Sequence, residues 1–405
     1  MKRFFLLTLA SAALLGASAA PVKTYEVKSP DGRLALVLTA GERLSFTVAR
    51  DGETLVAPSE MALTLSTGEV LGESPRVRSA RRRAVSETID APLYRQSRFD
   101  AAYNELDLRL RGDYGILARA YDDGVCYRFY TERDGELTIV DETAQLNFEG
   151  DPSAYIPYSK TEIPMRTSFE NTYEYAPLSK FRTQTVAFMP VLVDLGERGY
   201  VLYTESDVEA YPGVYLTYDK EAKGFAARFA ECPTETSLTK RFQDVVERSA
   251  DYIARVDGRR SYPWRIVAYA ATATELPVND MVWQTAEASR VADASWVRDG
   301  KIAWDWWNNW GVYGVDFKSG INTETYKYFI DFAAANGIEY VALDEGWGVR
   351  DGDVMHVVPE IDLPEIVSYA REKKVGIILW VVAKVLDDKL EEACRYYSEL
   401  GVAGW

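Results

Sequence analysis

The chain changes from one structural rhythm to another near residue 300, and this change constrains its fold more than any single motif. From about residue 24 to 270, short segments of alternating polar and apolar residues are separated by turn dipeptides. The dipeptides are Asp31-Gly32, Asp51-Gly52, Asp134-Gly135 and Lys223-Gly224. Asp-Gly readily adopts the positive φ angles of a tight hairpin, and the alternation leaves one face of each strand buried. We therefore predict a large antiparallel β-sandwich over residues 20–270.

After residue 300, strand-like and helix-like segments alternate. Strand-like segments begin near residues 302, 339, 375 and 402. Between the first two, Asn322 or Thr323 is placed to cap the start of a helix, and Gly337 to end it. The run "VGIILWVV" lacks alternation, as expected for a strand covered on both faces. Repeated βα units form either a doubly wound sheet or a (β/α)₈ barrel.

The barrel is favoured because no glycine-rich phosphate loop follows the first of these strands. Residues 271–300 have a looser pattern and are interpreted as a linker. The predicted fold class is thus multidomain, β plus α/β: a large antiparallel β-sandwich followed by a truncated (β/α)₈ TIM barrel. Residues 301–405 are expected to form the first half of that barrel.

The N-terminus has the pattern of a secretory signal peptide. Lys2 and Arg3 precede an apolar stretch, Phe4 to Leu15, and small residues occupy positions 17–19. We expect residues 1–19 to be removed, since the apolar stretch is short for a membrane span. No later segment has eighteen consecutive apolar residues. The mature chain is therefore expected to be secreted, periplasmic and free of a membrane anchor.

Composition narrows the classes of partner. A formal net charge of −16 disfavours nucleic acid, because phosphate binding needs a basic surface. The 26 tyrosines and 10 tryptophans suit sugar-binding clefts, although ordinary core packing explains such residues as well. Three cysteines are too few for a disulfide framework, and one bridge is optional. A single histidine, His356, excludes a histidine-rich zinc site.

Acids and indoles follow the predicted strands after residue 300. In a barrel, the loops after the strands' C-terminal ends form the active face. Carboxylates there can bind hydroxyls or transfer protons, and indoles can stack on a sugar. The alternative is that the acids cap the following helices. The candidate substrate-binding residues are Asp305, Trp306, Asn308, Asp344, Glu345, Trp347 and Trp380.

These residues carry a resemblance to a known family. The stretch from "SWVRDGKIAWDWWNNW" to "IEYVALDEGW", with "EIDLPEIVSYAREKKVGIILW", resembles glycoside hydrolase family 97. Upstream, "YDDGVCYRFY", "TESDVEAYPGVYL" and "YPWRIV" occur in the family's order. The resemblance implies a bacterial exo-α-glycosidase, acting on terminal α-linked glucose or galactose of an oligosaccharide. It leaves the sugar, the linkage and the choice between retention and inversion open.

The resemblance also implies a calcium ion at the active site. In the family, one calcium ligand comes from the sandwich domain. The resemblance places it at the glutamate of the segment Thr204 to Gly213, which is Glu205. Calcium takes six to eight oxygens, so one glutamate is an incomplete site. The family's catalytic acid and nucleophile are expected beyond Trp405, and the 405-residue chain is therefore expected to be inactive. The alternative function is a non-catalytic carbohydrate-binding protein.

Overall fold

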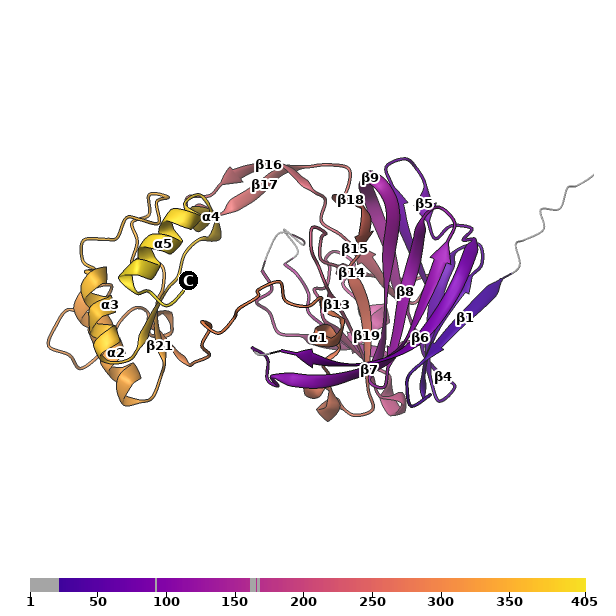
Figure 1. Ribbon diagram of the computed structural model, residues 1–405, viewed down its shortest axis with the longest axis horizontal. Helices are drawn as coiled ribbons and strands as arrows, with labels where there is room; N and C mark the ends of the chain where they lie inside the picture. The colour runs from indigo at the N-terminus through magenta and orange to yellow at the C-terminus, as the bar shows by residue number, and fades with distance from the viewer. Residues whose placement is uncertain (1–21, 92, 161–164, 166–167) are drawn as a thin grey trace, which may run out of the picture. The chain divides into compact units, whose positions relative to one another are not determined.

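A computed structural model describes residues 22–91, 93–160, 165 and 168–405 (Figure 1). The expected signal peptide lies outside the described residues. The chain forms two compact units. One, here called the β unit, runs up to Cys232 and includes Ala250–Ala288; the other, the βα unit, comprises Pro233–Ser249 and Ser289–Trp405. Residues 233–249 thus group with the βα unit, although they fall within the predicted sandwich range.

The β unit is built from antiparallel strands, as its alternating sequence predicts. In β2, Leu34, Leu36 and Leu38 are fully buried and the residues between them are partly exposed. Its strands are β1 Lys23–Lys28, β2 Leu34–Ala40, β3 Leu44–Arg50, β4 Glu53–Leu65, β5 Val70–Leu71, β6 Val77–Asp90, β7 Arg98–Leu110, β8 Tyr114–Tyr121, β9 Gly124–Asn147, β10 Ser153–Ile156, β11 Glu174–Pro177, β12 Val191–Asp194, β13 Tyr200–Ser206, β14 Tyr215–Asp219, β15 Gly224–Arg228, β18 Ala254–Ser261 and β19 Trp264–Ala270. A short helix, α1 Met281–Thr285, follows them.

The structure confirms one of the predicted Asp-Gly turns and contradicts another. Asp51 and Gly52 have φ angles of 50° and 88° and join β3 to β4 in a tight hairpin, as predicted. Asp134-Gly135, by contrast, does not end a strand, so the predicted turn there is wrong. β9 runs through it and pairs with β18 on both sides of a register shift next to Gly258.

The reason lies in the partner strand. A Cβ atom on Gly258 would lie 2.6 Å from the Arg133 carbonyl oxygen and 2.7 Å from that of Gly135. Only glycine allows the two backbones to approach so closely, and the two extra residues of β9 are absorbed in a β-bulge opposite Gly258. Arg259 beside it pairs with Asp134 at 2.5 Å.

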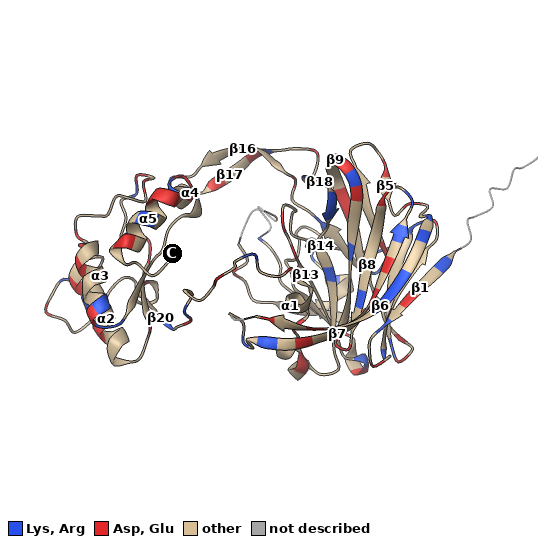
Figure 2. Cartoon of the chain, in the orientation of Figure 1, with Lys and Arg blue, Asp and Glu red and all other residues tan. Residues whose placement is uncertain are grey.

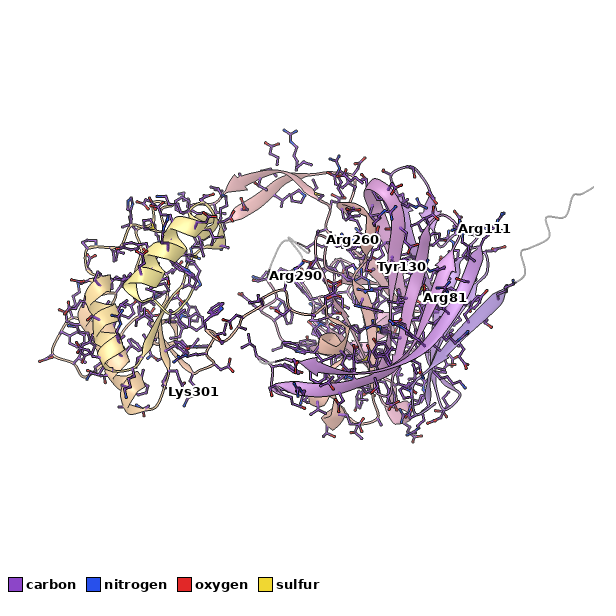
Figure 3. The ribbon with its side chains drawn as sticks, in the orientation of Figure 1. Arg81, Arg111, Tyr130, Arg260, Arg290 and Lys301 are labelled. Carbon is purple, nitrogen blue, oxygen red and sulfur yellow. The ribbon has the colours of Figure 1, made fainter. Side chains whose placement is uncertain are left out.

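The mostly exposed strand β6 carries a basic run, with arginines at positions 78, 81, 82 and 83 (Figure 2). Arg81 lies opposite Asp107 on β7, and Arg83 forms an ion pair of 2.6 Å with Glu105. Asp107 in turn accepts a 2.6 Å hydrogen bond from the Tyr130 hydroxyl on β9 (Figure 3 labels Arg81 and Tyr130). Arg83 is therefore neutralised by a carboxylate of the neighbouring strand.

The βα unit contains a parallel sheet, β20 Ile302–Trp304, β21 Tyr340–Leu343 and β22 Gly376–Leu379, in that order. Its helices are α2 Thr323–Ala335, α3 Leu363–Glu372, α4 Ala383–Asp387 and α5 Leu390–Leu400, and a single 3₁₀ turn, η4 Asp305–Asn308, follows β20. Asn322 caps α2 as predicted, because its side chain accepts a 2.9 Å bond from the Thr325 amide. Phe329 and Ile330 of α2 belong to the same core cluster as Val341 of β21. The described residues thus show a small βα sheet rather than a barrel.

A separate hairpin, β16 Pro233–Leu238 and β17 Asp244–Ser249, belongs to the βα unit. Its strands are mostly exposed, and a turn over residues 239–243 joins them. Among the described helices, none is long and apolar enough to cross a membrane. Cys126, Cys232 and Cys394 form no disulfide within the described residues.

Candidate functional site

The C-terminal ends of the three parallel strands are aligned. Trp304 pairs with Ala342 across β20 and β21, and Leu343 pairs with Leu379 across β21 and β22. Because parallel strands end at a common edge, the residues that follow them start from one side of the sheet. Those residues include every predicted substrate-binding residue: Asp305, Trp306, Asn308, Asp344, Glu345, Trp347 and Trp380.

Asp305 and Asp344 form a buried pair of acids with all four oxygens engaged. Asp305 accepts the Tyr326 hydroxyl at 2.6 Å on Oδ2 and the Asp344 amide at 3.1 Å on Oδ1. Asp344 accepts the Trp304 indole N–H at 2.5 Å on Oδ2 and the Glu345 amide at 2.6 Å on Oδ1. Their exposed fractions are 0% and 4%. Neither acid caps a helix, and both hold neighbouring groups in place; a direct contact with substrate stays a prediction.

Burial changes the acidity of this pair. Burial raises the pKa of Asp305 to about 6, against the hydrogen bonds from Tyr326 and the Asp344 amide, which lower it; the Asp344 charge raises it further. Burial also raises the pKa of the Tyr326 hydroxyl, and the Asp305 charge adds to that rise. Asp305 is therefore protonated more readily than an exposed aspartate.

Glu345 differs from the two aspartates because it reaches the surface. Its side chain is 19% exposed and is held by two arginines. Arg241 of the β16–β17 turn lies 2.6 Å away and Arg350 3.1 Å away, both on Oε1. Within the described residues these bonds leave Oε2 open.

Indoles surround the strand ends. Trp304 stacks on Trp306 with ring centroids 5.8 Å apart, and Trp306 is half exposed. Asn308 is exposed beside them. Trp347 is buried and donates its indole N–H to the Trp380 carbonyl at 2.8 Å, whereas the Trp380 ring remains partly exposed. Trp347 thus acts as an anchor for the turn that presents Trp380.

A small pocket lies beside Glu345. Its volume is about 80 Å³. Apolar side chains form most of its wall, with Glu345 and the two arginines among the charged groups at its surface. Its lining includes Arg241, Phe242, Glu345, Trp347, Arg350 and Trp380.

Glu205, the predicted calcium ligand, lies at the end of β13 in the β unit. Its Oε2 accepts a 2.5 Å bond from Arg265, and its Oε1 accepts the Val214 amide at 3.0 Å. Arg265 is fully buried and also binds both oxygens of Glu142, at 2.8 and 2.7 Å. Two glutamates thus share one buried guanidinium.

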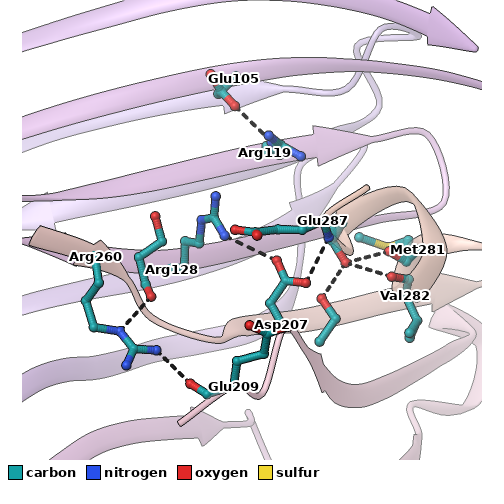
Figure 4. Close-up of polar contacts among 12 residues, drawn as sticks. Glu105, Arg119, Arg128, Asp207, Glu209, Arg260, Met281, Val282 and Glu287 are labelled. Carbon is teal, nitrogen blue, oxygen red and sulfur yellow. Dashed lines mark hydrogen bonds and ion pairs between the residues drawn. The ribbon is translucent and has the colours of Figure 1, made fainter. Parts of the chain in front are cut away.

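The next acid in the same segment, Asp207, ties β13 to the residues after α1. It pairs with Arg128 at 3.3 Å and accepts the Glu287 amide at 2.9 Å (Figure 4). Within the described ranges, no group of three or more His, Cys, Asp or Glu side chains is placed to hold a metal ion.

Sequence reasoning does not single out Arg265 or Arg241. Arg265 carries a usable signal, because a charged residue in the apolar strand "WRIVAYA" must find buried partners. Arg241 carries none: Lys240-Arg241 in a polar turn reads as solvated surface. Its partner, Glu345, lies 104 residues further along the chain.

Comparison with known proteins agrees with this architecture. Residues 27–287 match the family model described as Glycosyl-hydrolase 97 N-terminal, and residues 306–405 match Glycoside hydrolase 97. A retaining α-galactosidase of Bacteroides thetaiotaomicron is 41% identical over 392 residues, covering 95% of this chain and 59% of the relative. A probable retaining α-galactosidase of Streptomyces bingchenggensis is 30% identical over 391 residues, covering 93% of this chain and 55% of the relative.

Solved structures share the fold. A glycoside hydrolase family 97 enzyme in complex with acarbose, from Pseudoalteromonas sp. strain K8, superposes with a TM-score of 0.77 at 19% identity, covering 93% of this chain and 58% of that chain. A β-arabinopyranosidase superposes with a TM-score of 0.73 at 21% identity, covering 93% and 61%. This chain spans less than two thirds of the length of the curated relatives that it matches. On the strength of the two family models and the 41% identical relative, the chain belongs to glycoside hydrolase family 97.

Proposed function

We propose that the natural polypeptide carrying this chain is an exo-α-glycosidase that removes terminal α-linked galactose from oligosaccharides. One observation carries the proposal: an open carboxylate, Glu345, and partly exposed indoles lie at the aligned ends of three parallel strands. A concave site with apolar walls and a few directed polar groups suits a sugar. The 41% identical relative is a retaining α-galactosidase, which supports galactose over glucose and retention over inversion.

In this proposal the described residues bind and position the sugar. A retaining glycosidase uses two carboxyl groups about 5–5.5 Å apart, one as nucleophile and one as acid and base. We assign neither role to Asp305 or Asp344, because their four oxygens already accept bonds from within the chain. Asp344 instead orients the Trp304 indole and the backbone that carries Glu345.

Two further features belong to the same proposal. The three parallel strands would be part of a (β/α)₈ barrel, which the family membership and the parallel register support. Export to the periplasm is supported by the basic and apolar pattern of residues 1–19, which lie outside the described part of the chain.

Calcium remains the proposed cofactor of the natural polypeptide, with Glu205 as one of its ligands. The described residues do not by themselves fit a calcium ion. Calcium takes six to eight oxygens, whereas both oxygens of Glu205 already accept protein hydrogen bonds, one of them from a cation. No step of the reaction is therefore derived through the metal.

Because the described residues do not fit calcium by themselves, we make a prediction for the 405-residue chain. Calcium stabilises a fold only if it binds the native state, so millimolar calcium should leave the melting temperature unchanged. Thermal denaturation with calcium and with a chelator measures this. A rise of several degrees with calcium alone would show that the chain holds a more complete site than Glu205 provides.

Hydrolysis assays test the function itself. The natural polypeptide is expected to release the aryl group from an aryl α-galactoside much faster than from the matching α-glucoside. Faster hydrolysis of the glucoside would contradict the galactose assignment. Binding of galactose without turnover of either substrate would favour the second candidate, a non-catalytic carbohydrate-binding protein, which the open carboxylate and indoles of this site also suit.

A further inference from the structure

We propose that the turn of the β16–β17 hairpin is part of the sugar site, with Arg241 as a positioning residue that holds Glu345 for a substrate hydroxyl. The proposal rests on the proposed glycosidase function, which it deepens by naming a residue that sets substrate affinity. It concerns only contacts within the βα unit. Three independent observations support it: the ion pair, the pocket and the exposure of the hairpin strands.

The ion pair joins residues far apart in the sequence. Arg241 approaches Glu345 to 2.6 Å, and Arg350 approaches the same oxygen to 3.1 Å. Charge-assisted bonds of this length fix the direction of a carboxylate. Because both cations lie on Oε1, Oε2 is left to accept a hydrogen bond from a ligand. A sugar hydroxyl is a suitable donor, whereas an anionic ligand would be repelled by the Glu345 charge.

The turn also shapes the pocket. Phe242 has a φ of 57°, an uncommon conformation for a residue with a bulky side chain. Its ring lies against Gly352, where an added Cβ would come within 2.8 Å of the ring edge. Phe242, Trp380 and Glu345 all line the pocket of about 80 Å³. A single water needs about 10–15 Å³ of such space, so the pocket has room for several water-sized groups, such as one edge of a pyranose ring.

The hairpin has no core of its own to keep it in place. Every residue of β16 is exposed, and β17 is mostly exposed. A lone two-stranded hairpin is marginally stable in water, so contacts at its turn matter. The described contacts of the turn with the rest of the βα unit include the Arg241–Glu345 pair and the Phe242 packing. The hairpin is therefore best explained as an extension of the βα unit whose turn, with Arg241 and Phe242, forms part of the wall of the sugar site.

The test compares arginines at the two ends of the same hairpin, in the natural polypeptide. R241A is expected to raise KM for an aryl α-galactoside about fivefold to tenfold, with kcat changed by less than about twofold. R241K should recover part of the loss, since it restores the charge but not the planar donor. R248A is the matched control. It removes an exposed arginine that pairs with Glu235 at 2.8 Å on the hairpin strands, and it should leave KM unchanged.

A double variant separates positioning from general damage. If Arg241 acts through Glu345, R241A combined with E345Q should cost little more than E345Q alone. Additive effects, an unchanged KM in R241A, or an equal rise in R248A would each overturn the proposal. Circular dichroism and thermal denaturation of each variant check that the fold is retained. If R241A fails to fold, the R241K result decides.

Failure of the proposed function can be recognised separately. If the wild-type protein turns over no α-glycoside, galactose binding is measured by calorimetry on the same variants. Weaker binding of galactose by R241A than by R248A would then support the inference that the turn of the β16–β17 hairpin belongs to a non-catalytic sugar site. Equal affinities, or no binding of galactose by the wild-type protein, would overturn the inference.

Discussion

Replacing Arg265 with methionine is expected to destabilise the β unit by about 3–5 kcal/mol, because two buried carboxylates would lose their shared cation. Arg265 is fully buried, and the side chains of Glu142 and Glu205 are 3% and 13% exposed. Burial lowers the pKa of Arg265, but the two glutamates outweigh this and keep the pKa above its ordinary value. The arginine is thus charged at any working pH, and its removal leaves unpaired negative charge inside the unit.

Chemical denaturation of R265M and wild type measures this loss. R259A is the matched control: Arg259 also pairs with an acid, Asp134, but their side chains are 67% and 89% exposed. Exposed ion pairs are screened by water and contribute little to stability, so R259A should unfold nearly as wild type does. Equal losses in the two variants would show that the buried network does not carry the stability assigned to it here.

Asp305 is expected to make the chain less stable as pH rises, whereas most aspartates make a folded protein more stable as pH rises. Replacing Asp305 with asparagine should remove this effect. The pKa of Asp305 is about 6 in the folded chain and about 3.9 in an unfolded one. Between these two pH values Asp305 binds more protons in the folded state than in the unfolded one, so its contribution to stability falls as pH rises through about 4 to 6. The two-unit difference corresponds to roughly 3 kcal/mol.

The difference in unfolding free energy between D305N and wild type isolates this group. It should shift by roughly 2 kcal/mol in favour of the variant between pH 4 and pH 7, since an unfolded aspartate is already half ionised at pH 4. D331N is the control with the opposite sign, because the hydrogen bond from Lys373 and that from Tyr369 lower the pKa of Asp331, although burial raises it. A difference for D305N that is constant across this pH range would contradict a raised pKa for Asp305.

For the aspartates after β20 and β21, the sequence pattern predicts their position in the fold, whereas tertiary contacts determine their hydrogen bonds. Both follow short apolar strands, and that pattern alone predicts that they lie at one edge of a parallel sheet. The pattern does not show which carboxylate oxygens remain open. That depends on Tyr326 from α2 and Trp304 from β20, which reach across the sheet edge to Asp305 and Asp344.

The two Asp-Gly dipeptides make the same point for the fold. Asp51-Gly52 and Asp134-Gly135 have the same local preference for positive φ angles, yet the first closes a hairpin and the second lies within β9. The difference comes from β18, where Gly258 allows the bulged strand to stay paired. A turn dipeptide predicts a local backbone shape, whereas strand pairing decides whether the chain reverses there.

The sequence by itself determined the element types, the order of the β and βα segments and the family, because these depend on side-chain periodicity and on long local motifs. Tertiary structure alone decided that residues 233–249 join the βα unit, that Arg241 reaches Glu345, and that Arg265 is shared by Glu142 and Glu205. Each of these contacts joins residues between about 60 and 123 positions apart, or brings a segment of one predicted domain into another. Such contacts form because a buried or half-buried charge is costly unless it is paired with an opposite charge. The fold decides which residue lies close enough to be that partner, and the local pattern of side chains does not predict it.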